Sequence, residues 1–355
     1  MGSRISWVDN AKAIGIMLVF VGHFIEKGVY VFHNDMLWHL YKAIYAFHMP
    51  FFFLLAGYFY RDYQGRFGSF VYLKIKTRLV PVVFFVLLSL LCWQWPDIWP
   101  VIESSKEQQM ELIWLMLQGR PIASWPCWFF ISLFIVEVVA AELIPVLRTK
   151  IRYGLALPLV FWLALVVTKD MTLSANLLGI AESAWMFQQS FMALFFYLLG
   201  YGCRQYANQL MPNSVDGRST LWAAVLGLAV LVLTYRFNFE GGRGSVNMSG
   251  GVYGDAGWFL LAAIPGIVFT VYLAACLPVN RCLDFLGKHT IPLVGINGWM
   301  ISFLYPWFWS WLPVQWEGWP LFFVALALAL LTLLLAMPIA WLMGRYMPWM
   351  VGQWK

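Results

Sequence analysis

Charged residues are scarce in this chain of 355 residues. Lys and Arg number 23 and Asp and Glu number 17, which together make 11% of the sequence, whereas hydrophobic residues make up 62%. A soluble domain carries about 25% charged residues, and surface-to-volume scaling keeps much of any folded chain in contact with water. The composition therefore excludes a soluble enzyme, a disordered tail and a fibrous repeat, and it indicates a polytopic membrane protein.

Cysteine is also rare, and its pattern excludes two kinds of site. The chain has five cysteines, an odd number, and no two of them have Cys-x-x-Cys spacing. Neither a disulfide framework nor a metal site is indicated, so we expect no metal. The net charge of +6 is not a nucleic-acid signal when the basic residues follow membrane topology, and we expect no nucleic-acid partner.

Long apolar runs fill most of the chain. A helix needs about 20 mostly apolar residues to span a bilayer, within a range of about 17–25. Ten segments are candidates, namely 11–32, 37–60, 70–95, 125–147, 152–168, 187–203, 219–236, 256–277, 288–312 and 319–343. The sequence thus predicts an all-α transmembrane bundle of about ten spans. We expect it to be a single domain over residues 1–355 with no attached soluble domain.

The basic residues are unevenly distributed between the loops that these segments define. With the N-terminus in the cytoplasm, 16 of the 23 basic residues fall on the inner side and seven on the outer side. The positive-inside rule favours this orientation, which places both termini in the cytoplasm. The largest outer loops are then 96–124 and 237–255, and the second, which is rich in Gly, is expected to be mobile.

The first predicted helix carries the polar residues that point most clearly to chemistry, because ionisable groups inside a membrane are costly. Lys12 and His23 are eleven residues apart, within about 20° of three full turns, so they point the same way. The rise between them is about 16 Å, which puts His23 near the bilayer middle. Glu26 follows one turn later, where a carboxylate can hold the imidazole tautomer. The simpler alternative is a packed histidine.

Other polar residues lie at membrane depth in later segments. His48 is followed by Pro50, which frees the carbonyl four residues before it, although a kinked structural helix is the alternative. Glu137 lies near mid-depth in its segment and needs a partner or a water cavity. The remaining candidates are Trp128 and Asn297.

Three cations, Lys74, Lys76 and Arg78, lie at the inner start of the third segment. Basic residues in inner loops fix the orientation of a membrane protein, and taken alone the run favours this interpretation as a topology anchor. The functional alternative is a cradle for a phosphorylated cytosolic ligand.

The run from Asp9 to His23 resembles the first-helix signature of the acyltransferase-3 family of membrane acyltransferases: a basic residue, ten intervening residues, then His. Further matches follow in chain order at 48–58, 74–81, 128–129 and 285–290, with a weaker one at 196–200. The resemblance covers most of the chain and is nearest to the sugar O-acetylase group. The family usually has Arg, Ser and His where this chain has Lys12, Ala56 and Asn297.

This resemblance implies transfer of an acyl group, most often acetyl from acetyl-CoA, to a sugar hydroxyl of an envelope glycan or glycolipid. It implies an integral protein of the bacterial cytoplasmic membrane whose partners are lipid, acyl-CoA and the sugar acceptor. His23 would act either as the base for the acceptor hydroxyl or as an acyl relay. Glu26 or Asp9 would orient or charge-balance it.

The other residues receive roles around that reaction. The donor phosphates would be held by Lys12, Lys74, Lys76 and Arg78. The acceptor side, or support of the site, would fall to His48, Trp128, Glu137 and Asn297. Two rival classes remain: a transporter or flippase that uses the intramembrane His and Glu residues, and a non-enzymatic scaffold. The absence of a visible inverted repeat weighs against the first, and the Lys12–His23 alignment weighs against the second.

Overall fold

The computed structural model describes residues 6–32, 34–93, 106–207, 216–240, 243–278, 280–313 and 316–354. Within these ranges the chain is helical, and strand pairing is limited to one isolated bridge between Asn247 and Val252. The predicted all-α fold is confirmed. The α-helices are α1 (Ser6–Phe32), α2 (Asp35–Tyr58), α3 (Phe67–Lys74), α4 (Val80–Trp93), α5 (Lys106–Leu117), α6 (Trp128–Val146), α7 (Lys150–Lys169), α8 (Met171–Leu178), α9 (Ser190–Tyr206), α10 (Gly217–Thr234), α11 (Ala256–Cys276), α12 (Arg281–Lys288), α13 (Thr290–Ser310) and α14 (Gly318–Tyr346).

Seven stretches of the described chain are long and apolar enough to cross a membrane. They are Trp7–Val29, Asp35–Tyr58, Ser124–Val146, Lys150–Lys169, Gly217–Phe237, Ala256–Cys276 and Gly318–Tyr346. The other three predicted segments are also helical, as α3 with α4, as α9 and as α13. Residues 94 and 95 of the third segment lie outside the described residues. Ten spans and the orientation of the termini stay predictions.

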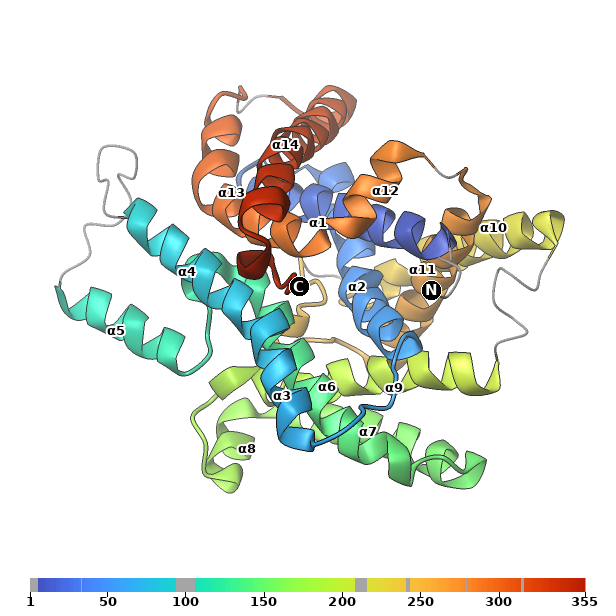
Figure 1. Cartoon of the computed structure of the whole chain (residues 1–355). Coiled ribbons are helices and arrows are strands. Elements are labelled where there is room, and N and C mark those ends of the chain that lie inside the picture. Colours follow the sequence, from blue (N-terminus) through green and yellow to red (C-terminus); the bar gives the residue numbers. More distant parts are fainter. Residues whose placement is uncertain are drawn as a thin grey trace.

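Helices α1 and α2 lie in the middle of the bundle (Figure 1). They form an antiparallel pair, and α1 also packs against α11, α12, α13 and α14, while α2 packs against α9 and α11. The start of α2 is capped by Asn34, whose side chain accepts hydrogen bonds from the backbone N–H groups of Met36 and Leu37, which satisfies donors that the helix leaves unpaired. The central position of the two helices buries His23 and His48 inside the protein.

The peripheral helices carry exposed apolar side chains. Leu155 and Trp162 of α7, Leu226 of α10 and Leu334 of α14 are all exposed. Exposed apolar side chains in this number are costly in water and suit the hydrocarbon of a membrane. The exposed faces of α7, α10 and α14 therefore suit contact with lipid.

Helices α2 and α9 touch through their backbones. A Cβ atom on Gly57 would lie 1.8 Å from the carbonyl oxygen of Tyr197, and one on Gly200 would lie 1.9 Å from that of Leu54. Small residues allow this approach between membrane helices. The contact places Tyr197 beside the cavity described below.

Candidate active site

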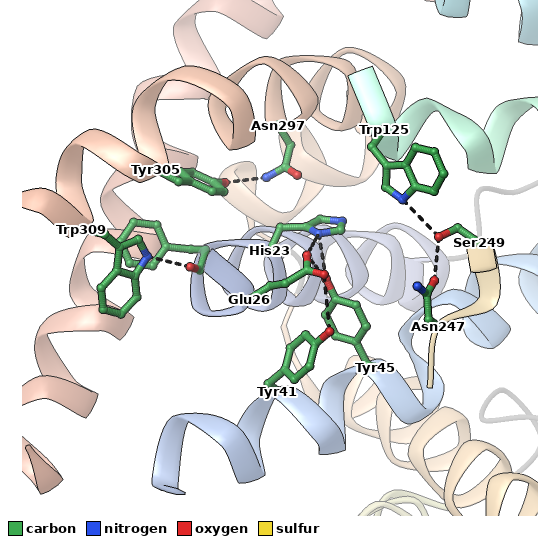
Figure 2. Close-up of polar contacts among 11 residues, drawn as sticks. His23, Glu26, Tyr41, Tyr45, Trp125, Asn247, Ser249, Asn297, Tyr305 and Trp309 are labelled. Carbon is green, nitrogen blue, oxygen red and sulfur yellow. Dashed lines mark hydrogen bonds and ion pairs between the residues drawn. The ribbon is translucent and has the colours of Figure 1, made fainter. Parts of the chain in front are cut away.

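His23 lies in α1 and is bonded through one ring nitrogen (Figure 2). Its Nδ1 atom is 3.1 Å from Oε2 of Glu26 and 2.8 Å from the hydroxyl of Tyr45. That hydroxyl donates to the same carboxylate at 2.7 Å, and Tyr41 donates to its other oxygen at 3.4 Å. A carboxylate only accepts hydrogen bonds, so it favours the tautomer with the proton on Nδ1 and leaves Nε2 able to accept one.

Helix α2 supplies the groups that surround this histidine. Tyr41, Tyr45 and His48 recur at helical spacing and lie on one face. His48 is 2% exposed, its Nδ1 donates to the carbonyl of Ile44 at 2.8 Å, and its ring centroid is 6.4 Å from that of His23. Gly22 brings the helices together, since a Cβ there would lie 3.1 Å from the Tyr45 ring.

A large cavity, the basic vestibule, lies at the end of the bundle where α1 begins and α2 ends. Its volume is about 490 Å³, and Lys12, Lys74, Arg78 and Glu137 line it. Glu137 accepts from Lys74 at 2.8 Å and from two nitrogens of Arg78 at 2.9 and 3.0 Å. The carboxylate therefore has the partners that its depth requires, and it fixes two cations at the cavity wall. We call this end of the bundle the basic end.

A small, mostly apolar cavity, which we call the passage, adjoins the basic vestibule and has His23 in its wall. Its volume is about 50 Å³. Phe52, Phe129 and Thr290 line both the vestibule and the passage, and the two phenylalanine ring centroids are 5.8 Å apart. His23 also lines the passage, and it does not line the vestibule. Lys12 and His23, predicted to share one face of α1, thus line successive cavities.

A third cavity, the outer cavity, begins at His23 and extends away from the basic end. Its volume is about 40 Å³, and His23, Met49 and Trp128 line both it and the passage. The other polar groups in its wall are Glu26, Tyr45, His48, Trp125, Asn247 and Ser249. The imidazole of His23 therefore stands where two cavities meet.

Residues 243–255 cover the outer cavity, although the sequence predicts a mobile loop there. The indole N–H of Trp125 donates to Ser249 at 3.1 Å, and the Ser249 hydroxyl donates to Asn247 at 2.7 Å (Figure 2). Gln189 donates to the carbonyl of Ser249 at 3.1 Å, and Val246 and Ser249 are buried. These bonds hold the segment against η2 (Ile122–Cys127) and the start of α9.

The structure separates some of the other predicted site residues from the histidine. Asp9 is 14 residues before His23, about 21 Å along the helix, and its backbone packs against Gly287. Lys76 faces away from the basic vestibule, with its ammonium 4.4 and 4.8 Å from the ring centroids of Tyr72 and Trp354.

Asn297 takes part in helix packing and does not line any of the three cavities. It is fully buried and donates to the hydroxyl of Tyr305 at 2.6 Å (Figure 2). One turn further along α13, Trp309 donates to the backbone carbonyl of Phe24 at 2.9 Å. The Asn297–Tyr305 bond lies within α13, and the Trp309–Phe24 bond joins α13 to α1 one residue after His23.

Sequence reasoning missed several groups at this site. Tyr41 and Tyr45 were not among the predicted site residues, although their helical spacing with the predicted His48 is a signal in the sequence. Asn247 and Ser249 carry no such signal, because their contacts depend on how a distant segment folds back. Within the described part of the chain, no three His, Cys, Asp or Glu side chains are grouped so that they could hold a metal ion.

Comparison with known proteins identifies the family. Neither a curated protein nor a solved structure matches the chain. A family model described as an acyltransferase domain, that of the acyltransferase-3 family, matches residues 5–341. Because this match covers nearly the whole sequence, the chain belongs to the acyltransferase-3 family of membrane acyltransferases.

Proposed function

We propose that this protein transfers an acetyl group from cytosolic acetyl-CoA to a hydroxyl of an envelope glycan or a lipid-linked sugar. One observation carries the proposal: His23 lines both the passage from the basic vestibule and the outer cavity. A donor and an acceptor can therefore approach one imidazole from opposite ends of the bundle. This arrangement suits a donor and an acceptor that lie on opposite sides of a membrane.

The basic end faces the cytosol in this proposal. The positive-inside rule favours that orientation, with ten spans and both termini in the cytoplasm. The membrane is then the bacterial cytoplasmic membrane, since the acceptor belongs to the envelope.

The donor binds with its phosphates in the basic vestibule. Lys12, Lys74 and Arg78 line this cavity, and Arg in particular matches the geometry of phosphate oxygens. Glu137 keeps Lys74 and Arg78 in place through ion pairs of 2.8 and 2.9 Å. The phosphates then add ligands to cations that are already positioned, and the acyl arm extends into the passage.

The size of the passage favours acetyl over longer acyl groups. Its volume of about 50 Å³ is about a tenth of that of the vestibule, and its phenylalanine lining favours a short acyl group. Each additional methylene would have to displace the rings of Phe52 and Phe129. Discrimination by one methylene in an apolar pocket is worth about 10–200-fold.

His23 acts as a general base in direct transfer. Its Nδ1 is bonded to Glu26 and Tyr45, so Nε2 takes the proton of the acceptor hydroxyl as the oxygen attacks the thioester carbon. The C–S bond then breaks, and the proton passes from Nε2 to the leaving thiolate. The products are the O-acetyl ester and CoA with a free thiol.

The acceptor hydroxyl enters through the outer cavity. Trp125 and Trp128 offer aromatic surfaces there, while His48, Asn247 and Ser249 offer hydrogen-bonding groups. The outer cavity has a volume of about 40 Å³, much less than that of the basic vestibule. In this proposal the segment 243–255 moves to admit the sugar ring.

The test is consumption of acetyl-CoA by the purified protein in the presence of envelope glycan. We expect His23→Gln to lower kcat by about 10²–10⁴-fold, the usual contribution of a general base, with unchanged protein yield. His39→Gln, an exposed histidine of α2, is the matched control and retains activity. Wild-type protein should use butyryl-CoA poorly.

Three results would count against the proposal. Full activity of His23→Gln would remove the base. Ping-pong kinetics with an acetylated protein would replace direct transfer by a relay. Substrate uptake into vesicles without acyl-CoA consumption would favour the transporter alternative.

A further inference from the structure

Besides the basic vestibule, the basic end of the bundle has a further cavity, which we call the second cavity. It has no role in the transfer step. Its volume is about 720 Å³. Its wall contains Arg61, Arg148, Arg204, Asp62, Tyr60 and Tyr201. Tyr60 and Arg61 line this cavity and the basic vestibule alike, so the two adjoin where α2 ends.

The cavities lie in series along α2. Met49 lines the passage beside His23, Phe52 lines the passage and the vestibule, and Tyr60 lines the vestibule and the second cavity. Eleven residues separate Met49 from Tyr60, about 16 Å at the rise of a helix. An extended phosphopantetheine arm is of comparable length. A ligand that places its acyl end at His23 therefore reaches the second cavity with its other end.

The charges of the second cavity favour an anion. Three arginines face one carboxylate, that of Asp62, which is 3.1 Å from Nη2 of Arg148. Arg204 donates to the carbonyls of Tyr58 and Tyr60 at 3.3 and 3.5 Å, which holds its guanidinium at the end of α2. The excess of two cations suits a phosphate monoester, which carries about −1.5 to −2 charge at pH 7.

These arginines are more than topology anchors. They come from three places in the chain, after α2, after α6 and in α9, and they converge on one concave surface. All three are Arg, whose planar fork suits phosphate. The rings of Tyr60 and Tyr201 meet edge to face with centroids 5.8 Å apart, and a tyrosine ring is a stacking surface for a nucleobase.

We propose that the second cavity binds the 3′-phosphorylated adenosine end of the donor, with the arginines on the 3′-phosphate and a tyrosine ring against the adenine. This inference rests on the proposed use of acyl-CoA. The basic vestibule then holds the pyrophosphate, and the passage holds the acyl end. An anionic lipid headgroup is the other source of a phosphate ester at this surface.

The test compares acetyl-CoA with acetyl-3′-dephospho-CoA in nanodiscs of phosphatidylcholine. For the wild type we expect the KM of the dephosphorylated donor to be about tenfold higher or more, the usual effect of a hydrogen bond to a charged group. Arg148→Gln should raise the KM for acetyl-CoA by a similar factor and leave the other KM unchanged. Arg152→Gln, an exposed arginine of α7 outside this cavity, should change neither. Equal KM values for both donors in the wild type would overturn the proposal.

A binding measurement separates this inference from the proposed reaction. Adenosine 3′,5′-bisphosphate should raise the Tm of the wild type and not that of Arg148→Gln, whether or not turnover is detected. A thermal shift that is the same in both proteins, or that is missing in both, contradicts the assignment. If phosphatidylglycerol in the nanodisc produces the Arg148-dependent shift and the nucleotide does not, the cavity belongs to lipid. Failure to consume either donor, with the nucleotide shift intact, would fault the proposed function instead.

Discussion

The basic vestibule and the outer cavity both adjoin the passage that His23 lines, and they differ in volume and in charge. The vestibule has a volume of about 490 Å³ and contains Lys12, Lys74 and Arg78, whereas the outer cavity has about 40 Å³ and is lined mainly by aromatic and neutral polar groups. A wide basic cavity suits a large phosphorylated ligand. A small cavity of hydroxyl, amide and indole groups suits a neutral polyol. In the proposed reaction, each end of the bundle therefore receives one substrate.

The largest effect is expected at Glu26, because the reaction of both substrates depends on the tautomer of His23. Glu26→Gln replaces a carboxylate that only accepts by an amide that can also donate, so the Nδ1–H tautomer is no longer fixed, and an incorrect histidine tautomer costs up to about 10⁴-fold in kcat in a related arrangement. We expect kcat to fall by about 100-fold or more with little change in either KM. The measurement is steady-state kinetics with both substrates varied.

The matched control for Glu26 is Glu142→Gln. Glu142 is exposed and accepts a hydrogen bond from Tyr63 at 3.0 Å, and it lines none of the three cavities. Similar rates for the two variants would mean that the carboxylate beside His23 does not support the reaction.

A smaller effect, confined to the donor, is expected at the basic vestibule. Arg78→Gln should raise the KM for acetyl-CoA by about tenfold or more and leave the KM for the acceptor unchanged. Lys76→Gln is the control, since Lys76 stacks over Tyr72 and Trp354 outside the cavity. Equal increases for both variants would mean that the basic run acts only as a membrane anchor.

The smallest effect is expected at the outer cavity. Ser249→Ala removes the hydroxyl that joins Trp125 to Asn247, and a neutral hydrogen bond contributes about 0.5–1.5 kcal/mol. The KM for the acceptor should change by about 2–10-fold while the KM for acetyl-CoA stays constant. Ser310→Ala, on an exposed serine at the end of α13, should change neither. A change in the donor KM alone would reverse the assignment of the two cavities.

The parts of the site that lie on one helix could be predicted from the sequence. The period of α1 places Lys12, His23 and Glu26 along one side, and the structure has the His23–Glu26 contact at 3.1 Å. The same period explains why Lys76 faces away from the cavity. A residue two positions from both Lys74 and Arg78 points about 200° around the helix from each of them, so one cradle of all three cations was not compatible with a helix.

The parts that join distant segments could not be predicted in this way. The depth of Glu137 predicts that it has a partner, but the sequence does not identify that partner. Arg78 becomes the partner because α6 packs against η1 (Ile75–Leu79), a π-helical turn. The cover over the outer cavity depends on the buried contacts of Val246 and Ser249. A glycine-rich composition predicts a flexible backbone, but it does not predict those contacts.

The most direct test of the account is an experimental structure of the protein with a non-cleavable thioether analogue of acetyl-CoA. We expect the acyl carbon to lie in the passage, within about 5 Å of Nε2 of His23, which leaves room for one acceptor hydroxyl between them. We also expect the phosphates to lie beside Lys74 and Arg78. An acyl group that ends in the vestibule, with His23 sealed off from it by Phe52 and Phe129, would contradict the central claim.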